Sequence, residues 1–311
     1  MKKALLLTLL LTAMALAADL RLGIVGTDTS HATAFTSILN NPSAPGHVAG
    51  ARVVAAYKGG SDLPASANRV EKFAEELKTK WGVEFVADIP TLCGKVDAVL
   101  LESVDGRVHL EQAKQVFAAH KPVFIDKPLA ATLEDAREIA RLAKEAGVPW
   151  FSSSSYRFSG IAKAMKFADA TGVATWGPGP LEPLFPLDLA WYAIHPIELL
   201  YTLMGTGCEE VTRISGAKED LIVGRWKDGR IGSVRALRAA GDEGAVVDRP
   251  KKVVQSDPKM GGDYDALLEE VVKFFQTGKA PVAPEETVEM FAFMDAAQRS
   301  KTANGQPMRL R

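Results

Sequence analysis

The chain has 311 residues, of which 47% are hydrophobic and 24% are charged, so it is long enough for one large or two ordinary globular domains. Its formal net charge of −1 excludes a strongly basic surface of the kind that binds nucleic acid. After residue 20 the sequence contains no apolar run long enough to span a membrane.

Residues 1–17 have the pattern of a secretory signal peptide. Lys2 and Lys3 precede a short apolar stretch, and the small residues that follow predict cleavage near Ala17 or Ala18. We therefore expect general secretion to the periplasm or the cell exterior, and an uncleaved anchor is the alternative. In that compartment Cys93 and Cys208 could form a disulfide, although two lone cysteines are more often buried and reduced.

Residues 18–153 alternate short apolar runs with amphipathic helical patterns. The predicted strands cover residues 20–25, 51–57, 83–86, 97–102, 121–125 and 148–153. One predicted helix follows the first strand directly. The other predicted helices cover residues 67–81, 107–119 and 133–146, and Thr132 caps the start of the last one. This alternation is typical of an α/β fold, and it predicts a Rossmann-like doubly wound parallel sheet.

Residues 154–311 follow a different pattern, which predicts a second, α+β domain. A helix near 159–171 and a Pro-rich loop precede a second helix at 193–205. Three strands then follow closely at 209–216, 220–227 and 230–238, and an Asp-Gly turn joins the last two. Helices near 262–277 and 284–304 end the chain, so we expect an open antiparallel sheet covered by helices.

The loop "GIVGTDTSH" at 23–31 lies where a Rossmann fold binds the phosphates of a dinucleotide. Ligands of a doubly wound sheet bind beyond the carboxyl ends of its strands. The loop keeps the first glycine of the G-x-G-x-x-G pattern, but Asp28 replaces the second and no third follows. The candidate cofactor-binding residues at this edge are Gly26, Thr27, Asp28, Ser30, His31, Lys58, Glu102 and Lys127.

Two further segments carry side chains suited to acid–base chemistry. "FIDKPLA" places Lys127 just beyond the fifth strand, where an amine can polarise a hydroxyl group or donate a proton. "HPIELLYTLMG" places His195 and Glu198 on one helical face, as an acid–base pair or as two metal ligands. His109, in a polar stretch after the fourth strand, is a candidate substrate contact.

These segments together resemble the glucose-fructose oxidoreductase/inositol dehydrogenase/MocA family. "DKP" at 126–128 is similar to the family's Glu-Lys-Pro motif, with Asp for Glu. The helix that begins near His195 is similar to the family's helix with its catalytic His, and "EMFAFMDAAQRSKTANGQPMRL" is similar to the family's closing helix and strand. The resemblance covers nearly the whole chain after the signal peptide.

The resemblance implies an oxidoreductase that acts on a sugar or cyclitol with NAD or NADP, and a homo-oligomer. Lys127 and His195 would then handle the hydroxyl proton, with Glu198 or Asp188 as a carboxylate partner. The family's usual Asp is replaced by Trp191, one helical turn from Asp188. Lys58 suits the 2′-phosphate of NADP better than a bare ribose, and Tyr156 and Arg157 are candidate contacts of the carbohydrate.

Two alternatives remain open on the same scaffold. The first is a carbohydrate lyase, hydrolase or epimerase that needs no nicotinamide, with a divalent metal as an option because His and carboxylate side chains are available. Export of an unfolded chain favours this alternative, because a cofactor bound in the cytoplasm cannot accompany the chain. The second is a sugar-binding protein without catalytic activity.

Overall fold

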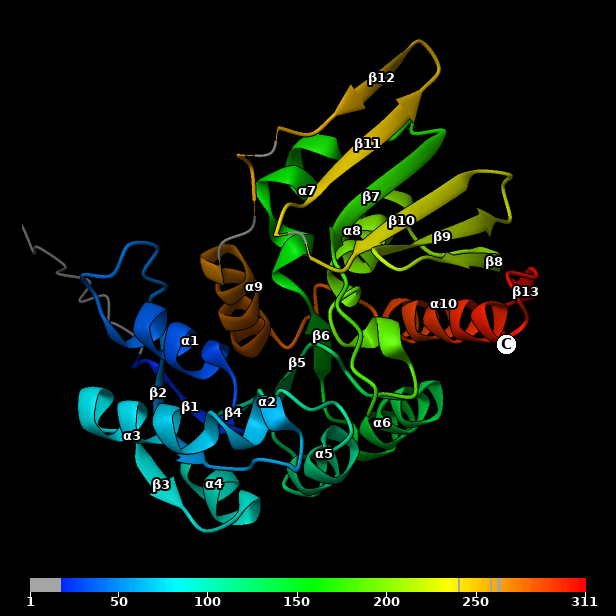
Figure 1. Ribbon diagram of the computed structural model, residues 1–311. Coiled ribbons are helices and arrows are strands. Elements are labelled where there is room, and N and C mark those ends of the chain that lie inside the picture. The colour runs from blue at the N-terminus through cyan, green and yellow to red at the C-terminus, as the bar shows by residue number, and fades with distance from the viewer. Residues whose placement is uncertain (1–17, 240, 258, 262–263) are drawn as a thin grey trace, which may run out of the picture.

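The computed structural model describes residues 18–239, 241–257, 259–261 and 264–311. The predicted signal peptide of residues 1–17 lies outside this part of the chain. Figure 1 shows two α/β units, each built around its own sheet. None of the helices in the described ranges is both long and apolar enough to cross a membrane. Cys93 and Cys208 are buried free thiols, so they do not form a disulfide in this structure.

The first unit is the predicted doubly wound sheet. In the described residues it has six parallel strands in the order β3-β2-β1-β4-β5-β6. Its strands are β1 (Leu20–Val25), β2 (Ala51–Tyr57), β3 (Glu84–Val86), β4 (Ala98–Leu101), β5 (Val123–Asp126) and β6 (Trp150–Ser153). Its helices are α1 (Ser30–Asn40), α2 (Pro64–Ala67), α3 (Val70–Trp81), α4 (Ile89–Lys95), α5 (His109–Ala118) and α6 (Leu133–Ala146).

The predicted strands of this unit are confirmed to within a few residues. Thr132 caps α6, where its side chain accepts a hydrogen bond from the backbone N–H of Asp135. The short helices α2 and α4 were not predicted, because four to seven residues are too few to show a helical period.

The second unit has a mixed sheet with the strand order β12-β11-β7-β10-β9-β8-β13 among the described residues. Its strands are β7 (Gly172–Pro178), β8 (Cys208–Ser215), β9 (Glu219–Trp226), β10 (Ile231–Leu237), β11 (Gly244–Arg249), β12 (Lys252–Gln255) and β13 (Met308–Arg309). Pairing is antiparallel except between β7 and β10, which run parallel. The predicted antiparallel sheet is therefore confirmed in outline, with one parallel pair at its centre.

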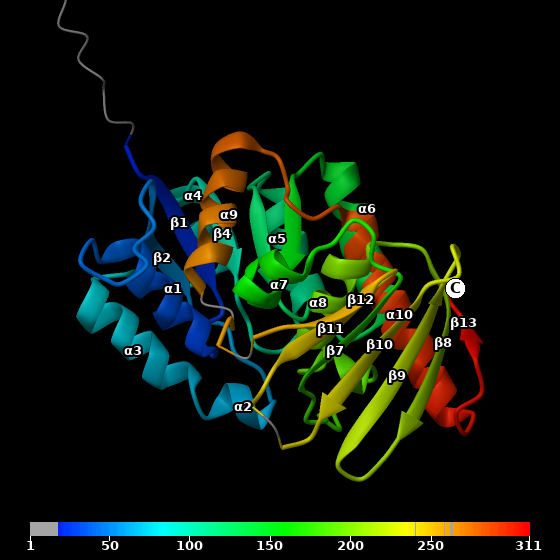
Figure 2. The same cartoon turned by 90° about the horizontal axis from the view of Figure 1, so that it is seen from above.

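Helices and short turns complete the second unit. The helices are α7 (Gly160–Met165), α8 (Ile194–Met204), α9 (Tyr264–Thr277) and α10 (Pro284–Thr302), and the 3₁₀ turns are η1 (Ser155–Phe158) and η2 (Asp188–Ala190). Helices α8 and α10 pack on the same side of the sheet, α8 against β7 and β10 and α10 against β8 (Figure 2). Every residue of α8 is buried, which explains why most of its sequence is apolar.

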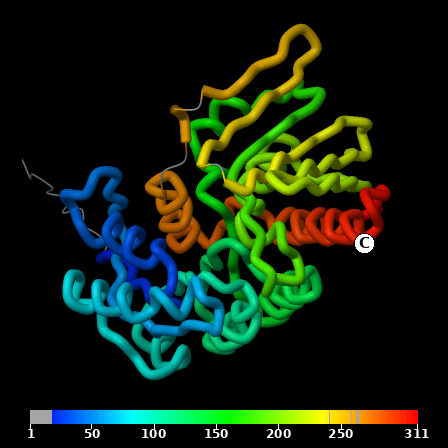
Figure 3. Tube along the Cα trace, viewed as in Figure 1, coloured from blue at the N-terminus to red at the C-terminus, as the bar shows by residue number. Residues whose placement is uncertain are grey.

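Helix α9 returns to the first unit. In Figure 3 this helix, drawn in orange, lies beside α1, drawn in blue. Leu268 and Phe274 of α9 are fully buried and pack in one core cluster with Ile24 of β1 and Phe35 of α1. The core of the first unit therefore includes residues from far beyond the predicted boundary at 153.

Candidate active site

A cleft of about 530 Å³ lies between the two units, beyond the carboxyl ends of β1 and β5. Both units contribute to its wall, as a doubly wound sheet with a second domain predicts. Its lining includes Thr29, Ser30, His31, Arg69, Val104, Lys127, Ser155, Tyr156, Pro178, Tyr192, His195 and Tyr264. Four residues predicted from the sequence, Ser30, His31, Lys127 and His195, therefore meet in one cleft, together with Tyr156.

Lys127 follows β5 directly and projects into this cleft. Its side chain is mostly buried, with 9% of the residue exposed. The ammonium nitrogen lies 5.1 Å from the ring centre of Tyr192, a cation–π distance. No carboxylate in the described part of the chain forms a salt bridge with this nitrogen. The amine is therefore available to an oxygen atom of a ligand.

His195, near the start of α8, lies on the side of the cleft that the second unit forms. Its Nδ1 is 2.6 Å from Oγ of Ser154, and its ring packs 4.9 Å from the ring of Tyr156. Burial, followed by the nearby charges of Lys127 and His31, lowers the pKa of His195 well below its ordinary value. The ring is therefore neutral at neutral pH and can accept a hydrogen bond or a proton.

His31 stands at the start of α1 and forms a close pair with Asp126. Nδ1 of the imidazole lies 2.5 Å from Oδ2 of Asp126, which is the last residue of β5. The ring is held between Phe35, 5.0 Å away, and Tyr264, 4.8 Å away. Burial alone would raise the pKa of Asp126, but the charge and hydrogen bond of His31, with help from Lys127, lower it.

Residues 20–153 match the model of an oxidoreductase family with an NAD-binding Rossmann fold. This part of the chain belongs to the Gfo/Idh/MocA family. A 1,5-anhydro-D-fructose reductase from Ensifer adhaerens is 43% identical over 115 residues, which are 36% of this chain. That match spans 33% of the length of the reductase, so this chain covers only about a third of that relative.

The whole chain has the Gfo/Idh/MocA fold. Myo-inositol 2-dehydrogenase from Lactobacillus plantarum superposes with a TM-score of 0.76 at 16% identity, over 94% of this chain and 100% of that chain. Myo-inositol dehydrogenase from Lactobacillus casei, solved with NAD(H) and myo-inositol, gives 0.74 at 16% identity, over 94% and 98%. At such low identity these likenesses establish the fold alone.

The loop after β1 keeps a glycine-specific turn at Gly26 although the second and third glycines of the phosphate-loop pattern are missing. Gly26 has a φ of +94°, and a Cβ there would lie 2.5 Å from the backbone nitrogen of Ser103, so only glycine fits. Asp28 is fully buried, and its Oδ1 accepts a hydrogen bond from the backbone N–H of Val104. The carboxylate thus lies beneath the loop, and it does not line the cleft where phosphates would bind. These features fit a dinucleotide.

The loop after β2 contacts both neighbouring loops. The backbone N–H of Thr27 donates to the carbonyl of Lys58, and the guanidinium of Arg107 bridges Asp62 and Asp105 at 2.6 and 2.7 Å. Lys58 itself pairs with Glu71 at 2.7 Å and is outside the cleft. Arg69, which the sequence did not single out, is the cation of this region that lines the cleft.

Glu198 and Arg157 pair with each other and not with a ligand. The carboxylate of Glu198 accepts hydrogen bonds from Nε of Arg157 and, at 3.0 Å, from Oγ of Ser153. Arg157 also forms a 2.7 Å ion pair with Glu286. The predicted pairing of His195 with Glu198 does not occur, because the arginine takes the carboxylate and Ser154 takes the imidazole.

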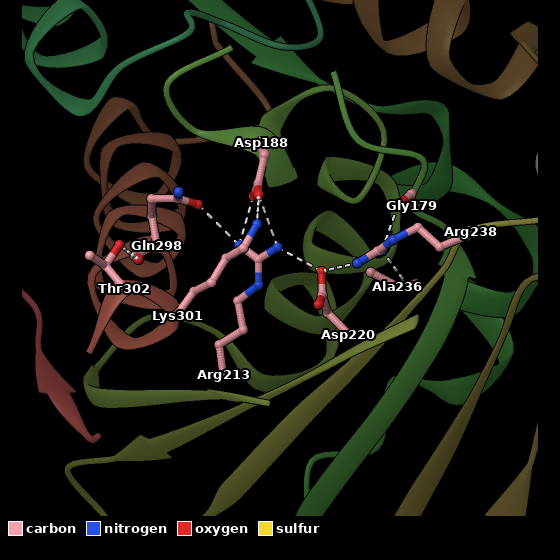
Figure 4. Close-up of polar contacts among 9 residues, drawn as sticks. All are labelled: Gly179, Asp188, Arg213, Asp220, Ala236, Arg238, Gln298, Lys301 and Thr302. Carbon is pink, nitrogen blue, oxygen red and sulfur yellow. Dashed lines mark hydrogen bonds and ion pairs between the residues drawn. The ribbon is translucent and has the colours of Figure 1, made fainter. Parts of the chain in front are cut away.

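Asp188 belongs to a buried ionic network in the second unit. Figure 4 shows its carboxylate between Arg213 and Lys301, each of which it contacts at 2.6 Å. Arg213 is fully buried and also pairs with Asp220. The carboxylate of Asp188 is therefore held by two cations, and Asp188 does not line the cleft.

His109 and Glu102 are fully buried and do not line the cleft. The ring nitrogens of His109 face the carbonyls of Ser103, at 2.7 Å, and Leu129, at 3.2 Å, so the ring ties two loops together. Burial, with the charges of Asp126 and Asp28, raises the pKa of Glu102 well above its ordinary value. Both residues are therefore buried at the edge of the sheet and are not exposed to a ligand in the cleft.

Two cleft features were missed by the sequence reasoning. Asp126 contacts His31, which lies 95 positions earlier, so the sequence around either residue contains no local signal of the pair. Tyr192 lies three residues before His195, in an apolar stretch whose pattern predicts an ordinary core residue. Among the described residues, no group of three or more His, Cys, Asp or Glu side chains is arranged to hold a metal ion.

Proposed function

We propose that the protein is an oxidoreductase that converts a secondary hydroxyl of a sugar or cyclitol to a carbonyl, or the reverse, with NAD or NADP. The observation that carries the proposal is the meeting of Lys127 and His195 in one cleft at the ligand edge of a Gfo/Idh/MocA domain. Two of the relatives, a 1,5-anhydro-D-fructose reductase and a myo-inositol 2-dehydrogenase, have names that agree with this substrate class.

The cleft residues supply the proton chemistry that such a reaction needs. Lys127, buried and without a carboxylate partner in the described residues, stabilises negative charge that develops on the substrate oxygen. His195 accepts a hydrogen bond from the reacting hydroxyl, because its ring is neutral. The rings of Tyr156 and Tyr192 offer apolar surface to the C–H face of a sugar ring.

A dinucleotide would contact the turn at Gly26 and the start of α1, where Thr29 and Ser30 line the cleft. When bound, its nicotinamide would take or give the hydride. Lys58 pairs with Glu71 and does not line the cleft. The residues around Arg69 would therefore determine the choice between NAD and NADP.

A cofactor-independent lyase or epimerase is the second candidate, and one observation favours it. The loop after β2 lacks an acidic residue at the ribose position and is tied to the loop after β4 by Arg107. In a Rossmann fold the adenosine lies between these two loops, so the missing acid and the tie through Arg107 both count against binding of a dinucleotide.

Cofactor titration decides between the two candidates. Calorimetry of the purified protein with NADH and NADPH should give a dissociation constant below about 1 mM for at least one of them. Lys127→Met and His195→Gln should each lower kcat on an oxidised sugar or cyclitol at least about 100-fold. Lys144→Met, in an exposed position of α6, is the matched control and should retain the wild-type rate. The absence of binding at millimolar cofactor would refute the oxidoreductase.

A further inference from the structure

Two departures from the family pattern meet in space. His31 occupies the third glycine position of the phosphate loop, counted from Gly26, and Asp126 replaces the glutamate of the Glu-Lys-Pro motif. The two residues are 95 positions apart in the sequence, and their side chains contact at 2.5 Å.

We propose that His31, oriented by Asp126, is the proton-transfer group of the cleft, and that His195 positions the substrate. This inference rests on the proposed oxidoreductase function and adds a catalytic residue to it.

The geometry of the pair is that of an oriented base. Asp126 is 2% exposed, and its second oxygen, Oδ1, accepts the backbone N–H of Lys127 at 2.8 Å, so the carboxylate cannot turn away. Nδ1–H of His31 donates to Oδ2, which leaves the Nε2 lone pair free. Phe35 and Tyr264 hold the ring from its sides, while the residue lines the cleft beside Lys127.

His195 lacks such a partner. Both carboxylates that its sequence neighbourhood offers, Glu198 and Asp188, are bound by Arg157 and Arg213. The hydrogen-bond partner of His195 is the uncharged hydroxyl of Ser154, and burial together with the charge of Lys127 opposes protonation of the ring. An imidazolium at His31 is stabilised by the carboxylate of Asp126, whereas an imidazolium at His195 has no such support.

The proposed step moves one proton. In the oxidation direction the O–H bond of the substrate breaks, Nε2 of His31 gains the proton, and the oxygen retains the electron pair that becomes the second bond of the carbonyl. A bound dinucleotide, held at Gly26 and the start of α1, would supply the acceptor for the hydride from the same carbon. In the reduction direction the imidazolium returns its proton to the oxygen.

The test combines turnover with the protonation pattern of the ring. His31→Gln should lower kcat at least about 100-fold while the dissociation constant of NADH changes little. Asp126→Asn should lower kcat in the same way, because an amide can stabilise the wrong tautomer. The ¹⁵N spectrum of the full-length protein labelled on histidine should show His31 protonated at Nδ1 alone, and Asp126→Asn should abolish that pattern. His47→Gln is the matched control, since His47 bonds the carbonyl of Ile38 and is outside the cleft.

Each outcome of this test supports or overturns the role proposed for His31. Wild-type turnover by His31→Gln would overturn the proposal and leave the oxidoreductase intact. If the wild type turns over no sugar or cyclitol, the oxidoreductase fails and the spectrum alone judges the pair. In that case a fixed Nδ1–H tautomer that depends on Asp126 supports an oriented base. Equal tautomer populations in the wild type and Asp126→Asn refute it.

Discussion

The carboxyl group of Glu102 is in an unusual environment for an acidic residue. It follows β4, is fully buried, and has no hydrogen-bond partner for either carboxyl oxygen within the described chain. Desolvation, followed by the charges of Asp126 and Asp28, raises its pKa well above the ordinary value. The residue is therefore a neutral acid beneath the cleft. Its protonation prevents a third negative charge from forming next to the carboxylates of Asp28 and Asp126.

Replacement of Glu102 by Gln should stabilise the protein at neutral pH. The folded carboxyl keeps its proton to a higher pH than the unfolded one, so the free energy of unfolding of the wild type falls as the pH rises above the ordinary range of a glutamate. Glu102→Gln lacks this loss, and its advantage should grow by up to about 1.4 kcal/mol for each pH unit in that interval. Chemical denaturation of both proteins from pH 4 to pH 8 measures it.

Glu71→Gln is the control for this experiment, because Glu71 is exposed and pairs only with Lys58. Its stability relative to wild type should vary little with pH. A Glu102→Gln variant that parallels the wild type at every pH would show that Glu102 is ionised in the folded protein.

At this scale the sequence predicted which residues enter the cleft better than it predicted their partners. Lys127 and His195 follow from their places after a strand and on a helix. The pairing of His195 with Glu198 fails although the two share a helical face. The carboxylate of Glu198 is instead bonded to Arg157, which belongs to a different element. Partners such as Asp126 and His31 depend on strand order and side-chain direction, which local spacing does not contain.

At the scale of elements, the ionic network around Arg213 joins β8, β9, η2 and α10. Arg213 of β8 contacts Asp188 of η2 and Asp220 of β9, and Lys301 of α10 contacts Asp188 from the other side (Figure 4). A buried arginine needs these carboxylates, since an unpaired charge in the interior costs several kcal/mol. The network therefore fixes the Pro-rich loop and η2 against the sheet.

Asp188→Asn should weaken the fold and leave the chemistry intact. Loss of one partner from this buried network should lower the free energy of unfolding by about 3 kcal/mol, as judged by denaturant titration. The kcat of the folded protein should stay near that of the wild type, because the carboxylate does not line the cleft. Asp169→Asn, which breaks the exposed pair with Arg249, should cost less than about 1 kcal/mol. A large fall in kcat without a loss of stability would restore Asp188 to catalysis.

The elements themselves could be predicted where one period dominates. The strands of the first sheet are short apolar runs between helices, and their order follows from the rules for doubly wound sheets. Strands β7, β11 and β12 were not predicted. Residues 166–171 continue an apparent helical pattern up to β7, and β11 and β12 follow a turn-rich segment. The parallel pairing of β7 with β10 depends on long-range contacts alone.

At the scale of the molecule, α9 makes the two units interdependent. Leu267, Leu268 and Val271 of this helix are buried in the core that β1 and α1 begin. Helix α10 likewise packs against α6 of the first unit. The cleft lies between surfaces that these two helices hold together, so its geometry depends on the packing of both.

Leu268→Ala should therefore destabilise both units at once. Removal of a fully buried leucine costs roughly 2–5 kcal/mol, and the cavity would open between α9 and the first sheet. Because α9 connects the units, thermal unfolding should remain a single transition at a lower temperature, and amide hydrogen exchange should accelerate in β1 and β2 as well as in α9. Leu184→Ala, at a position 45% exposed, should change neither measurement appreciably. Two separate transitions, with exchange in β1 and β2 unchanged, would show that the first unit is stable without α9 and would place the boundary at residue 153 after all.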